Sequence, residues 1–161
     1  MRKQLITKAS DADTRHPSPD GQWLDLDELA EAEISSEDAA SPIEAALLPS
    51  GNQGWRAAGP GEQIVRLRFA TPQSISRVHL EFAEECAERT QEFVLRWRPS
   101  GGGGIRELVR QQFTFSPAGA TREIEDYTVN LREVSELELS ITPDIRGGNA
   151  VASLKKLAVS R

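Results

Sequence analysis

The sequence predicts an all-β protein in which short antiparallel strands form two sheets packed as a sandwich. Apolar and polar residues alternate in runs after residue 62, as in Val65-Arg66-Leu67-Arg68-Phe69 and Leu137-Glu138-Leu139-Ser140-Ile141. A period of two places alternate side chains on one face of a strand. Clusters of Pro, Gly and Ser, which form turns, separate several of these runs. One apolar face per strand fits two sheets that share a core better than a parallel sheet buried on both sides.

The strands expected after residue 62 cover 65–69, 78–82, 93–97, 127–131, 137–141 and 157–159, with turns at 71–74, 99–104, 116–119 and 143–149. Before residue 62 the pattern is mixed, because the residues of 26–34 favour helix while Ala30, Ala32 and Ile34 alternate with acids. We assign a strand near Ala32–Ser35. One short helical turn is expected at 41–48, with Ser41 as its cap and Pro42 in its first position.

Length and composition fit one soluble globular domain. The chain has 161 residues, of which 38% are hydrophobic and 27% charged, which is enough to bury a core. Residues 1–20 mix Ser, Asp, Thr, Pro and Gly without periodicity, so we expect a flexible N-terminal tail there and a single domain over 21–161. No apolar run approaches the ~20 residues of a membrane-spanning helix, so no membrane partner is expected.

Charge and cysteine content narrow the partners and the compartment. The formal net charge is −6, whereas a phosphate backbone attracts clustered Lys and Arg. Nucleic acid is therefore an unexpected partner, and only the arginines at 89, 96, 98, 106 and 110 offer a local basic face. Cys86 is the single cysteine, and the basic start is not typical of a secretory signal. Both observations fit a reducing compartment, with the cytoplasm as the default.

The order of short motifs resembles galactose-binding-domain-like (discoidin, coagulation factor type C-like) domains over about residues 30–161. Ile34-Ser35-Ser36 is similar to the end of the family's first strand, and Pro42–Leu47 and Gly54-Trp55-Arg56 are similar to the loop that follows. The stretches that look like later strands are Ile64–Phe69, Ile75–Leu80, Glu92–Trp97 and Ala152–Val159. The resemblance implies a jelly-roll β-sandwich of about eight antiparallel strands, with ligand loops clustered at one end.

The resemblance also implies candidate site residues. In carbohydrate-binding relatives an Arg near the position of Arg89 often reaches the ligand, and its guanidinium suits vicinal hydroxyls or a carboxylate. The ligand-binding candidates are Arg56, Glu85, Arg89 and Gln91. The alternative for Arg89 is a surface ion pair with an acid of the preceding loop. Structural roles are expected for Trp55, Trp97 and Lys156, with both indoles packed in the interior.

Neither catalysis nor a cofactor is expected. A nucleophile needs a neighbouring base, and the two histidines are His16 in the tail and His79 on the polar face of a predicted strand. No Gly-x-Ser-x-Gly or His-Glu-x-x-His motif occurs. Glu123 and Glu125 are interpreted as a charged outward face of a strand, pointing away from Tyr127 and Val129.

The sequence therefore predicts a non-catalytic binding module for a carbohydrate or another small polar ligand, held by residues 50–56, 84–91 and 145–150. An intracellular protein–protein interaction module is the alternative, because no secretory signal, disulfide or clear aromatic cluster is present. A nucleic-acid-binding scaffold domain is a third hypothesis, which the acidic charge disfavours.

We predict that the domain needs no metal. Many relatives hold a structural Ca²⁺ near the first long loop, through loop carbonyls, a loop Asp and a Glu of the closing strand, and Ca²⁺ takes about six to eight oxygens. Here loop 48–54 has no Asp or Glu, and Lys156 stands where the family's Glu would fall. An ammonium only donates hydrogen bonds, so Lys156 is expected to tether loop 48–54 instead. A chelator should leave thermal unfolding unchanged. A stoichiometric calcium in elemental analysis would contradict the prediction.

Overall fold

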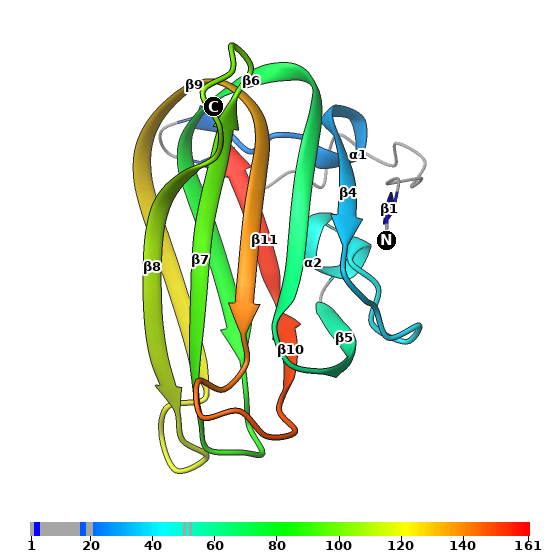
Figure 1. Cartoon of the computed structure of the whole chain (residues 1–161), viewed down its shortest axis with the longest axis vertical. Helices are drawn as coiled ribbons and strands as arrows, with labels where there is room; N and C mark the ends of the chain where they lie inside the picture. Colours follow the sequence, from blue (N-terminus) through cyan, green and yellow to red (C-terminus); the bar gives the residue numbers. More distant parts are fainter. Residues whose placement is uncertain (1, 4–16, 19–20, 50, 52) are drawn as a thin grey trace.

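The computed structural model describes residues 2–3, 17–18, 21–49, 51 and 53–161, which form an antiparallel β-sandwich (Figure 1). Its main strands are β4 (Ala30–Ile34), β5 (Trp55–Pro60), β6 (Gln63–Ala83), β7 (Arg89–Pro99), β8 (Arg106–Phe115), β9 (Arg122–Thr142), β10 (Val151–Leu154) and β11 (Lys156–Ser160). The shorter elements are β1 (Arg2–Lys3), β2 (Pro17–Ser18), β3 (Gly21–Gln22), α1 (Leu26–Leu29) and α2 (Glu44–Leu47). All pairings among the described strands are antiparallel. The predicted fold is confirmed, while most of the tail expected at 1–20 lies outside the described residues.

Two strands of 21 residues each, β6 and β9, run through both sheets. The first half of β6 pairs with β4 and with the second half of β9, whereas its second half pairs with β11 and with the first half of β9. The register shifts between Arg68 and Arg77, and such irregularities bend a strand. The turn predicted at 71–74 is therefore wrong, because the chain continues there as an irregular strand instead of reversing.

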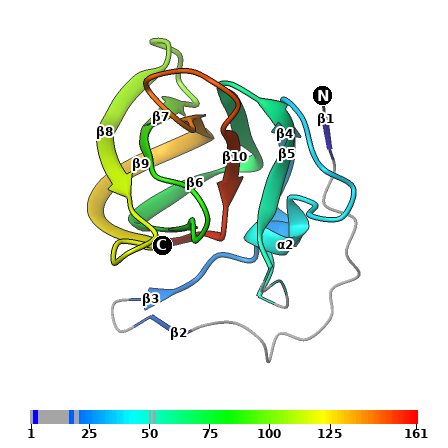
Figure 2. The ribbon, with the colours of Figure 1, turned by 90° about the horizontal axis from the view of Figure 1, so that it is seen from below.

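Two strand edges of the sandwich lack a hydrogen-bonded neighbour among the described strands. The hydrogen-bonded order is β1-β4-β6-β9-β7-β8, with β11 on the other half of β6 and a small β10-β5 sheet alongside. In this order β8 is one edge, and the first half of β9 forms the edge of the sheet that contains β11. Figures 1 and 2 place these two edges on the same side of the molecule.

The alternating runs fill the space between the sheets. The inward side chains of β6, for example Val65, Leu67, Val78 and Leu80, are fully buried. Trp55 is also buried, as expected, and its indole Nε1 donates a hydrogen bond to the Ser36 carbonyl at 3.1 Å. The largest fully buried side chains are Trp55, Phe82, Phe93, Phe115, Ile34, Ile43, Leu67, Ile75, Leu80, Leu95, Leu137 and Leu139.

Trp97 is only half-buried. It packs against the core, and the Arg106 guanidinium lies 5.3 Å from its ring centroid. Trp97 lies two residues before the end of β7, beyond the register shift between Leu95 and Arg96 in the β7–β8 ladder. The expectation of a core Trp97 is therefore met only in part.

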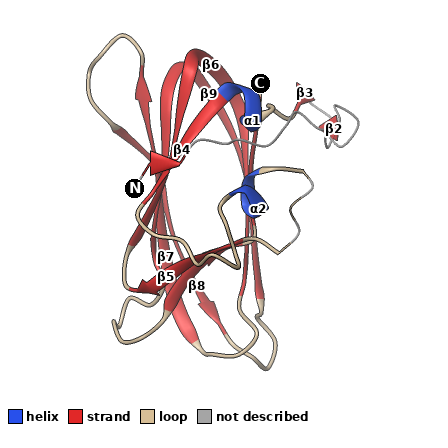
Figure 3. Cartoon of the chain, turned by 90° about the vertical axis from the view of Figure 1, so that its right-hand side faces the viewer, coloured by secondary structure: helices blue, strands red, loops and turns tan. Residues whose placement is uncertain are grey.

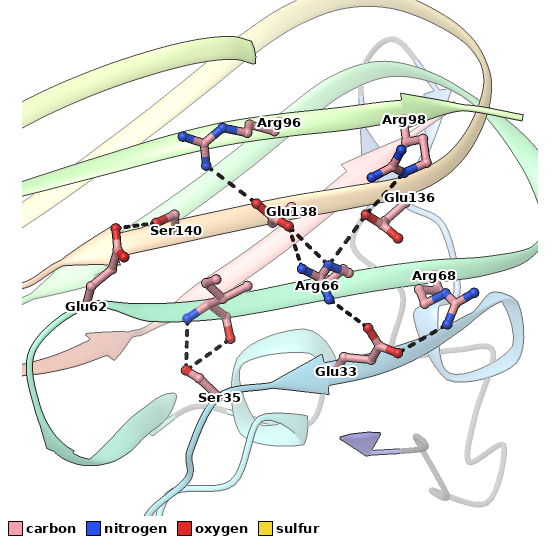
Figure 4. Close-up of polar contacts among 11 residues, drawn as sticks. Glu33, Ser35, Glu62, Arg66, Arg68, Arg96, Arg98, Glu136, Glu138 and Ser140 are labelled. Carbon is pink, nitrogen blue, oxygen red and sulfur yellow. Dashed lines mark hydrogen bonds and ion pairs between the residues drawn. The ribbon is translucent and has the colours of Figure 1, made fainter. Parts of the chain in front are cut away.

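The outward face of β4, β6, β9 and β7 carries a ladder of ion pairs (Figure 4). Arg66 lies at its centre, 3.0 Å from the Glu33 carboxylate and 2.8 Å from that of Glu138. The hydrogen bonds that Arg66 donates to Glu138 and Glu33 raise its pKa further above the ordinary value. Arg96 and Arg98 approach Glu138 and Glu136. Such pairs add little stability singly, but the ladder keeps this face polar and balanced in charge.

The two helices are single turns (Figure 3). The ambiguous segment 26–34 forms both elements, with helix α1 first and strand β4 directly after it. The strand predicted near 32–35 is therefore confirmed, and the residues that favour helix form α1. The cap predicted for the second helical turn is wrong, because α2 begins after Ile43 rather than at Pro42. The Glu37 carboxylate accepts the Ile43 amide at 2.6 Å and so takes the place expected for the Ser41 hydroxyl.

The two indoles should differ in their contribution to stability. We expect Trp55→Ala to lower the free energy of unfolding by about 3–5 kcal/mol, since it empties a closed site and leaves the Ser36 carbonyl without its donor. Trp97→Ala should cost roughly 1–2 kcal/mol, because the site is partly open to water. Urea denaturation followed by circular dichroism measures both. Equal losses for the two variants would contradict this ranking.

Candidate functional site

Three loops meet at one end of the sandwich, at the bottom of Figure 1 and nearest the viewer in Figure 2. They are 84–88 between β6 and β7, 116–121 between β8 and β9, and 143–150 between β9 and β10. The Glu84 amide donates to the Thr121 carbonyl at 2.9 Å, and the Ile145 amide donates to the Thr90 carbonyl at 2.8 Å. Two of the three predicted loop segments, 84–91 and 145–150, therefore come together. In the third segment, 50–56, Trp55 and Arg56 belong to β5. They stand opposite Leu154 and Ser153 of β10.

Arg89 ties these loops to the interior. Its side chain is 2% exposed, its Nε lies 2.7 Å from a Glu84 carboxylate oxygen, and its Nη1 donates to the Pro143 carbonyl at 2.8 Å. The guanidinium also stacks 4.8 Å from the Phe115 ring centroid. Burial alone would raise the pKa of Glu84, but the hydrogen bonds from Arg89 and the Cys86 amide outweigh it and hold the pKa below its ordinary value. The expectation that a non-binding Arg89 would be a surface residue is wrong.

A chain of polar contacts continues from Arg89 into the sandwich. Arg89 Nη1 donates to the Gln91 side-chain oxygen at 3.3 Å, and the Gln91 amide donates to Glu123 Oε1 at 3.2 Å. Gln91 and Glu123 are both buried. Gln91, predicted to contact ligand, thus links the loop end to an acid of β9.

The outward orientation predicted for Glu123 and Glu125 is wrong. Along the first half of β9, the odd-numbered positions are buried or half-buried, whereas Ile124 and Asp126 are exposed. Strand alternation places 123, 125 and 127 on one face, so Glu123, Glu125 and Tyr127 all point between the sheets. The sequence alone could have predicted this orientation, because residues 123 and 125 share the strand face of Tyr127, which is expected to be apolar.

Glu123 and Glu125 form an acid pair in this interior. Burial, reinforced by the neighbouring Glu125 carboxyl, raises the pKa of Glu123 to about 8. The second Glu123 oxygen, Oε2, and the Tyr127 hydroxyl are buried without a donor or acceptor among the described residues. Burial, with the charges of Glu125 and Glu123, also raises the pKa of Tyr127 to about 12. The phenol therefore stays protonated at neutral pH.

Aromatic residues of β7, β8 and β9 pack in two pairs. Phe93 contacts Tyr127 with ring centroids 6.5 Å apart, and Phe113 contacts Phe115 at 5.0 Å. Phe113 stands directly opposite Gln91 in the β7–β8 ladder. Glu123 is buried, whereas Glu125, Tyr127 and Phe113 are half-buried.

The exposed rim of the loop end carries further polar groups. Arg146 places its Nε 3.2 Å and its Nη2 3.3 Å from the two carboxylate oxygens of Asp144, and it also donates to the Glu88 carbonyl. The Arg146 side chain is 62% exposed. The Arg146 hydrogen bonds lower the pKa of Asp144. Glu85 is exposed in the neighbouring loop. Prediction from sequence had missed Arg146, although it falls in a predicted ligand segment.

Two other predicted residues lie elsewhere. Arg56 is exposed on β5. Lys156 stands opposite Glu81 in the β11–β6 ladder. Burial raises the pKa of Glu81, but the hydrogen bond and charge of His79 outweigh it and lower the pKa. The charge of Lys156 lowers it further. The tether from Lys156 to loop 48–54 stays a prediction, because positions 50 and 52 lie outside the described residues. The glycine before Trp55 does approach this region, since a Cβ on Gly54 would lie 2.5 Å from the Leu154 carbonyl oxygen.

His79 lies on the outward face, as predicted, but it is enclosed rather than solvated. Its Nδ1 is 2.9 Å from the Asp126 carboxylate, and its Nε2 is 2.7 Å from that of Glu81. Trp23 packs beside the imidazole, with ring centroids 6.1 Å apart. Carboxylates occupy both ring nitrogens, which leaves neither nitrogen placed to activate a nucleophile.

The arginines between 89 and 110 do not form a free basic face. Arg89 is buried against Glu84, Arg96 and Arg98 join the ion-pair ladder, Arg106 covers Trp97, and Arg110 pairs with Glu92 and Glu107. These arginines therefore do not provide the free basic face that binding of nucleic acid would need.

Among the described residues there is no group of three or more His, Cys, Asp or Glu side chains that could hold a metal ion. Within the same residues, no helix has the length and hydropathy to cross a membrane.

No protein-family model matches this chain, and no curated protein matches it. Solved structures match its fold. An F5/8 type C domain from Bacteroides fragilis aligns with a TM-score of 0.62 and 15% identity, over 88% of this chain and 97% of that domain. The chain has the discoidin fold. A family 32 carbohydrate-binding module of C. perfringens NanJ, in complex with galactose, aligns with a TM-score of 0.60 and 13% identity, over 82% of this chain and 93% of that module. XRCC1 bound to the DNA polymerase β catalytic domain aligns with a TM-score of 0.57 and 16% identity, over 79% and 91%.

The buried acid should make stability depend on pH in a defined direction. The pKa of Glu123 is raised from the ordinary 4.5 to about 8, so the folded state favours the protonated form. The stability from this group is complete below about pH 4.5 and is lost as pH rises through about 8. Glu123→Gln, which mimics the protonated acid, should therefore gain about 2–4 kcal/mol over the wild type between pH 5 and pH 9.

Urea denaturation at several pH values measures this difference. Glu107→Gln, which changes an exposed acid of β8, is the matched control and should follow the wild type. Parallel stability curves for wild type and Glu123→Gln would contradict burial of a protonated Glu123.

Proposed function

We propose that this protein is a non-catalytic module that binds a carbohydrate at the end of the sandwich formed by loops 84–88, 116–121 and 143–150. The observation that carries the proposal is Arg146, whose exposed guanidinium is held by both oxygens of Asp144 and by the Glu88 carbonyl. The Nη1 of this oriented guanidinium is used by none of these contacts, so it can donate two hydrogen bonds to the hydroxyls or the carboxylate of a sugar. Less side-chain entropy is then lost on binding.

The fold neighbours support the same class of ligand. Modules of this fold have been solved with galactose and with an unsaturated mannuronic acid, and another is described as pectin-binding. Their identity to this chain is 13–17%, so they support the class of ligand and leave the sugar open. Arg89, the first candidate from sequence, supports the site from below in this proposal, because its side chain is buried whereas that of Arg146 is exposed.

A glycan array followed by calorimetry on the strongest sugar tests the proposal. We expect Arg146→Ala to weaken binding at least ~10-fold, as loss of a charge-assisted contact would, while the melting temperature stays within about a degree because the side chain is exposed. Arg110→Ala is the matched control, since Arg110 is also exposed and ion-paired but lies on β8. An array without signal, or equal affinity in both variants, would refute the proposed site.

A protein-interaction module remains the second candidate, and one observation favours it. Among the described residues the exposed large hydrophobics are Ile105, Ile124 and Ile145, and none is aromatic. Sugar rings usually stack on aromatic faces, whereas an exposed aliphatic side chain on an edge strand, such as Ile124, suits a protein partner. The XRCC1 neighbour was solved with a protein partner. We further propose a reducing, cytoplasmic location, which fits the free exposed thiol of Cys86.

A further inference from the structure

Trp23 attaches the segment before α1 to the sheet that contains β11 and the second half of β6. The amide of the next residue, Leu24, donates a hydrogen bond to the Val159 carbonyl at 2.8 Å. The half-buried indole faces two basic groups, because the Arg77 guanidinium carbon is 5.0 Å and the His79 ring centroid 6.1 Å from its own centroid. Backbone hydrogen bonds at the end of a strand open readily. The attachment therefore depends on the contacts of the indole.

The contacts of His79 require a hydrogen on both of its ring nitrogens. Nδ1 lies 2.9 Å from an Asp126 carboxylate oxygen, and Nε2 lies 2.7 Å from a Glu81 carboxylate oxygen. A carboxylate only accepts hydrogen bonds, and a neutral imidazole carries a single N–H. In the neutral form, one of these two short contacts would bring a nitrogen lone pair against a carboxylate oxygen. Both contacts are hydrogen bonds only in the imidazolium.

The two carboxyls stay ionised near neutral pH. Burial raises the pKa of Glu81 and of Asp126, but the hydrogen bonds and charges of His79 and the neighbouring basic groups outweigh it and lower both pKa values. Arg77 donates to Asp126 at 3.0 Å, and Arg122 Nη2 lies 3.3 Å from Glu81. A proton is therefore gained or lost at the imidazole and not at its two partners.

The charged groups around the imidazole come from three strands. Among the described residues they are Arg77 and Glu81 of β6, Arg122 and Asp126 of β9, and Lys156 of β11. Loss of the imidazole proton leaves each carboxylate with a basic neighbour, so the network itself persists. It removes one hydrogen bond and the positive charge that faces Trp23. Because the face of an indole attracts cations, the change acts on the attached segment.

We propose that His79 is a pH-dependent clamp that holds residues 23–24 against β6 and β11. Histidine is the side chain whose ordinary titration falls between about pH 5 and 8. A cation that is stabilised by its contacts contributes attachment that is complete at low pH and is lost as the pH rises. The clamp is therefore closed at mildly acidic pH and loosens above it. None of its residues belongs to the loops of the proposed carbohydrate site, so this inference goes beyond that function and does not depend on it.

NMR spectroscopy of the full chain between about pH 5 and pH 8 tests the clamp. Imidazole nitrogen signals report whether both nitrogens of His79 carry hydrogen, and His79→Gln distinguishes them from those of His16. Hydrogen exchange of the Leu24 amide, corrected for its intrinsic rate, reports the attachment. We expect its protection to fall at least ~5-fold over this range, as for loss of one hydrogen bond to a charged group. The Ser35 amide, which donates to the Ile64 carbonyl at 3.0 Å, is the internal control and should not respond.

Three variants separate the charge of His79 from its shape. His79→Gln carries no charge, so Leu24 should exchange at low pH as fast as it does in the wild type at high pH. His79→Lys keeps a cation at this position and should protect Leu24 at both pH values. Arg122→Gln, which removes an exposed cation at Glu81 rather than at Trp23, is the matched control and should keep the wild-type response. Thermal melting verifies that the variants are folded. Constant Leu24 protection in the wild type, or an equal pH response in His79→Gln, would overturn the clamp.

Discussion

The long pairing of β6 with β9 is the constraint on which the other features depend. Each strand has 21 residues, and the pair crosses from one sheet to the other through the register shifts between Arg68 and Arg77. Because side chains alternate along a strand, the register in each half of the pair fixes which residues of that sheet face the core. The register that pairs Leu67 with Leu137 buries Leu137 and Leu139 in one sheet. The shifted register that pairs Val78 with Tyr127 turns Glu123, Glu125 and Tyr127 inward in the other. The acid pair is thus held by the strands that build the sandwich.

The polar chain from Glu84 to Glu123 buries charged and polar groups beneath the loop end of the sandwich. Arg89 is buried, but its partners come from the 84–88 loop, from β7 and from the segment after β9. Breaking a buried pair from one side leaves an uncompensated charge, which destabilises strongly. Arg89 therefore acts on the rim indirectly, by fixing the two loops that present Arg146 and Glu85. Such support below an exposed binding group is how a loop site obtains a defined geometry.

Much of the fold could be predicted from alternation and turn residues, because both are local. The runs at 65–69, 78–82, 93–97 and 137–141 all lie in strands, and Trp55 is buried as predicted. The continuity of β6 through Thr71-Pro72 was missed, since a bulged strand and a turn share the same residues. The burial of Arg89 was missed because it depends on Pro143 and Phe115, which are distant in sequence. The inward orientation of Glu123 could be predicted, because odd-numbered residues of β9 share the face of Tyr127. It was missed because a glutamate was expected to face water.

The rim of the loop end and the polar interior below it differ in their surroundings. Arg146 lies at the rim with most of its side chain in water, so it suits the hydroxyl or carboxylate groups that an incoming sugar presents first. Arg89, Gln91 and Glu123 are buried, and a lower dielectric there strengthens each contact and makes an unsatisfied group costly. The two regions are connected, because Arg89 bonds to Gln91 in the interior and also donates to the carbonyl of Pro143, at the start of the loop that carries Arg146. The geometry of the exposed guanidinium therefore depends on a buried one.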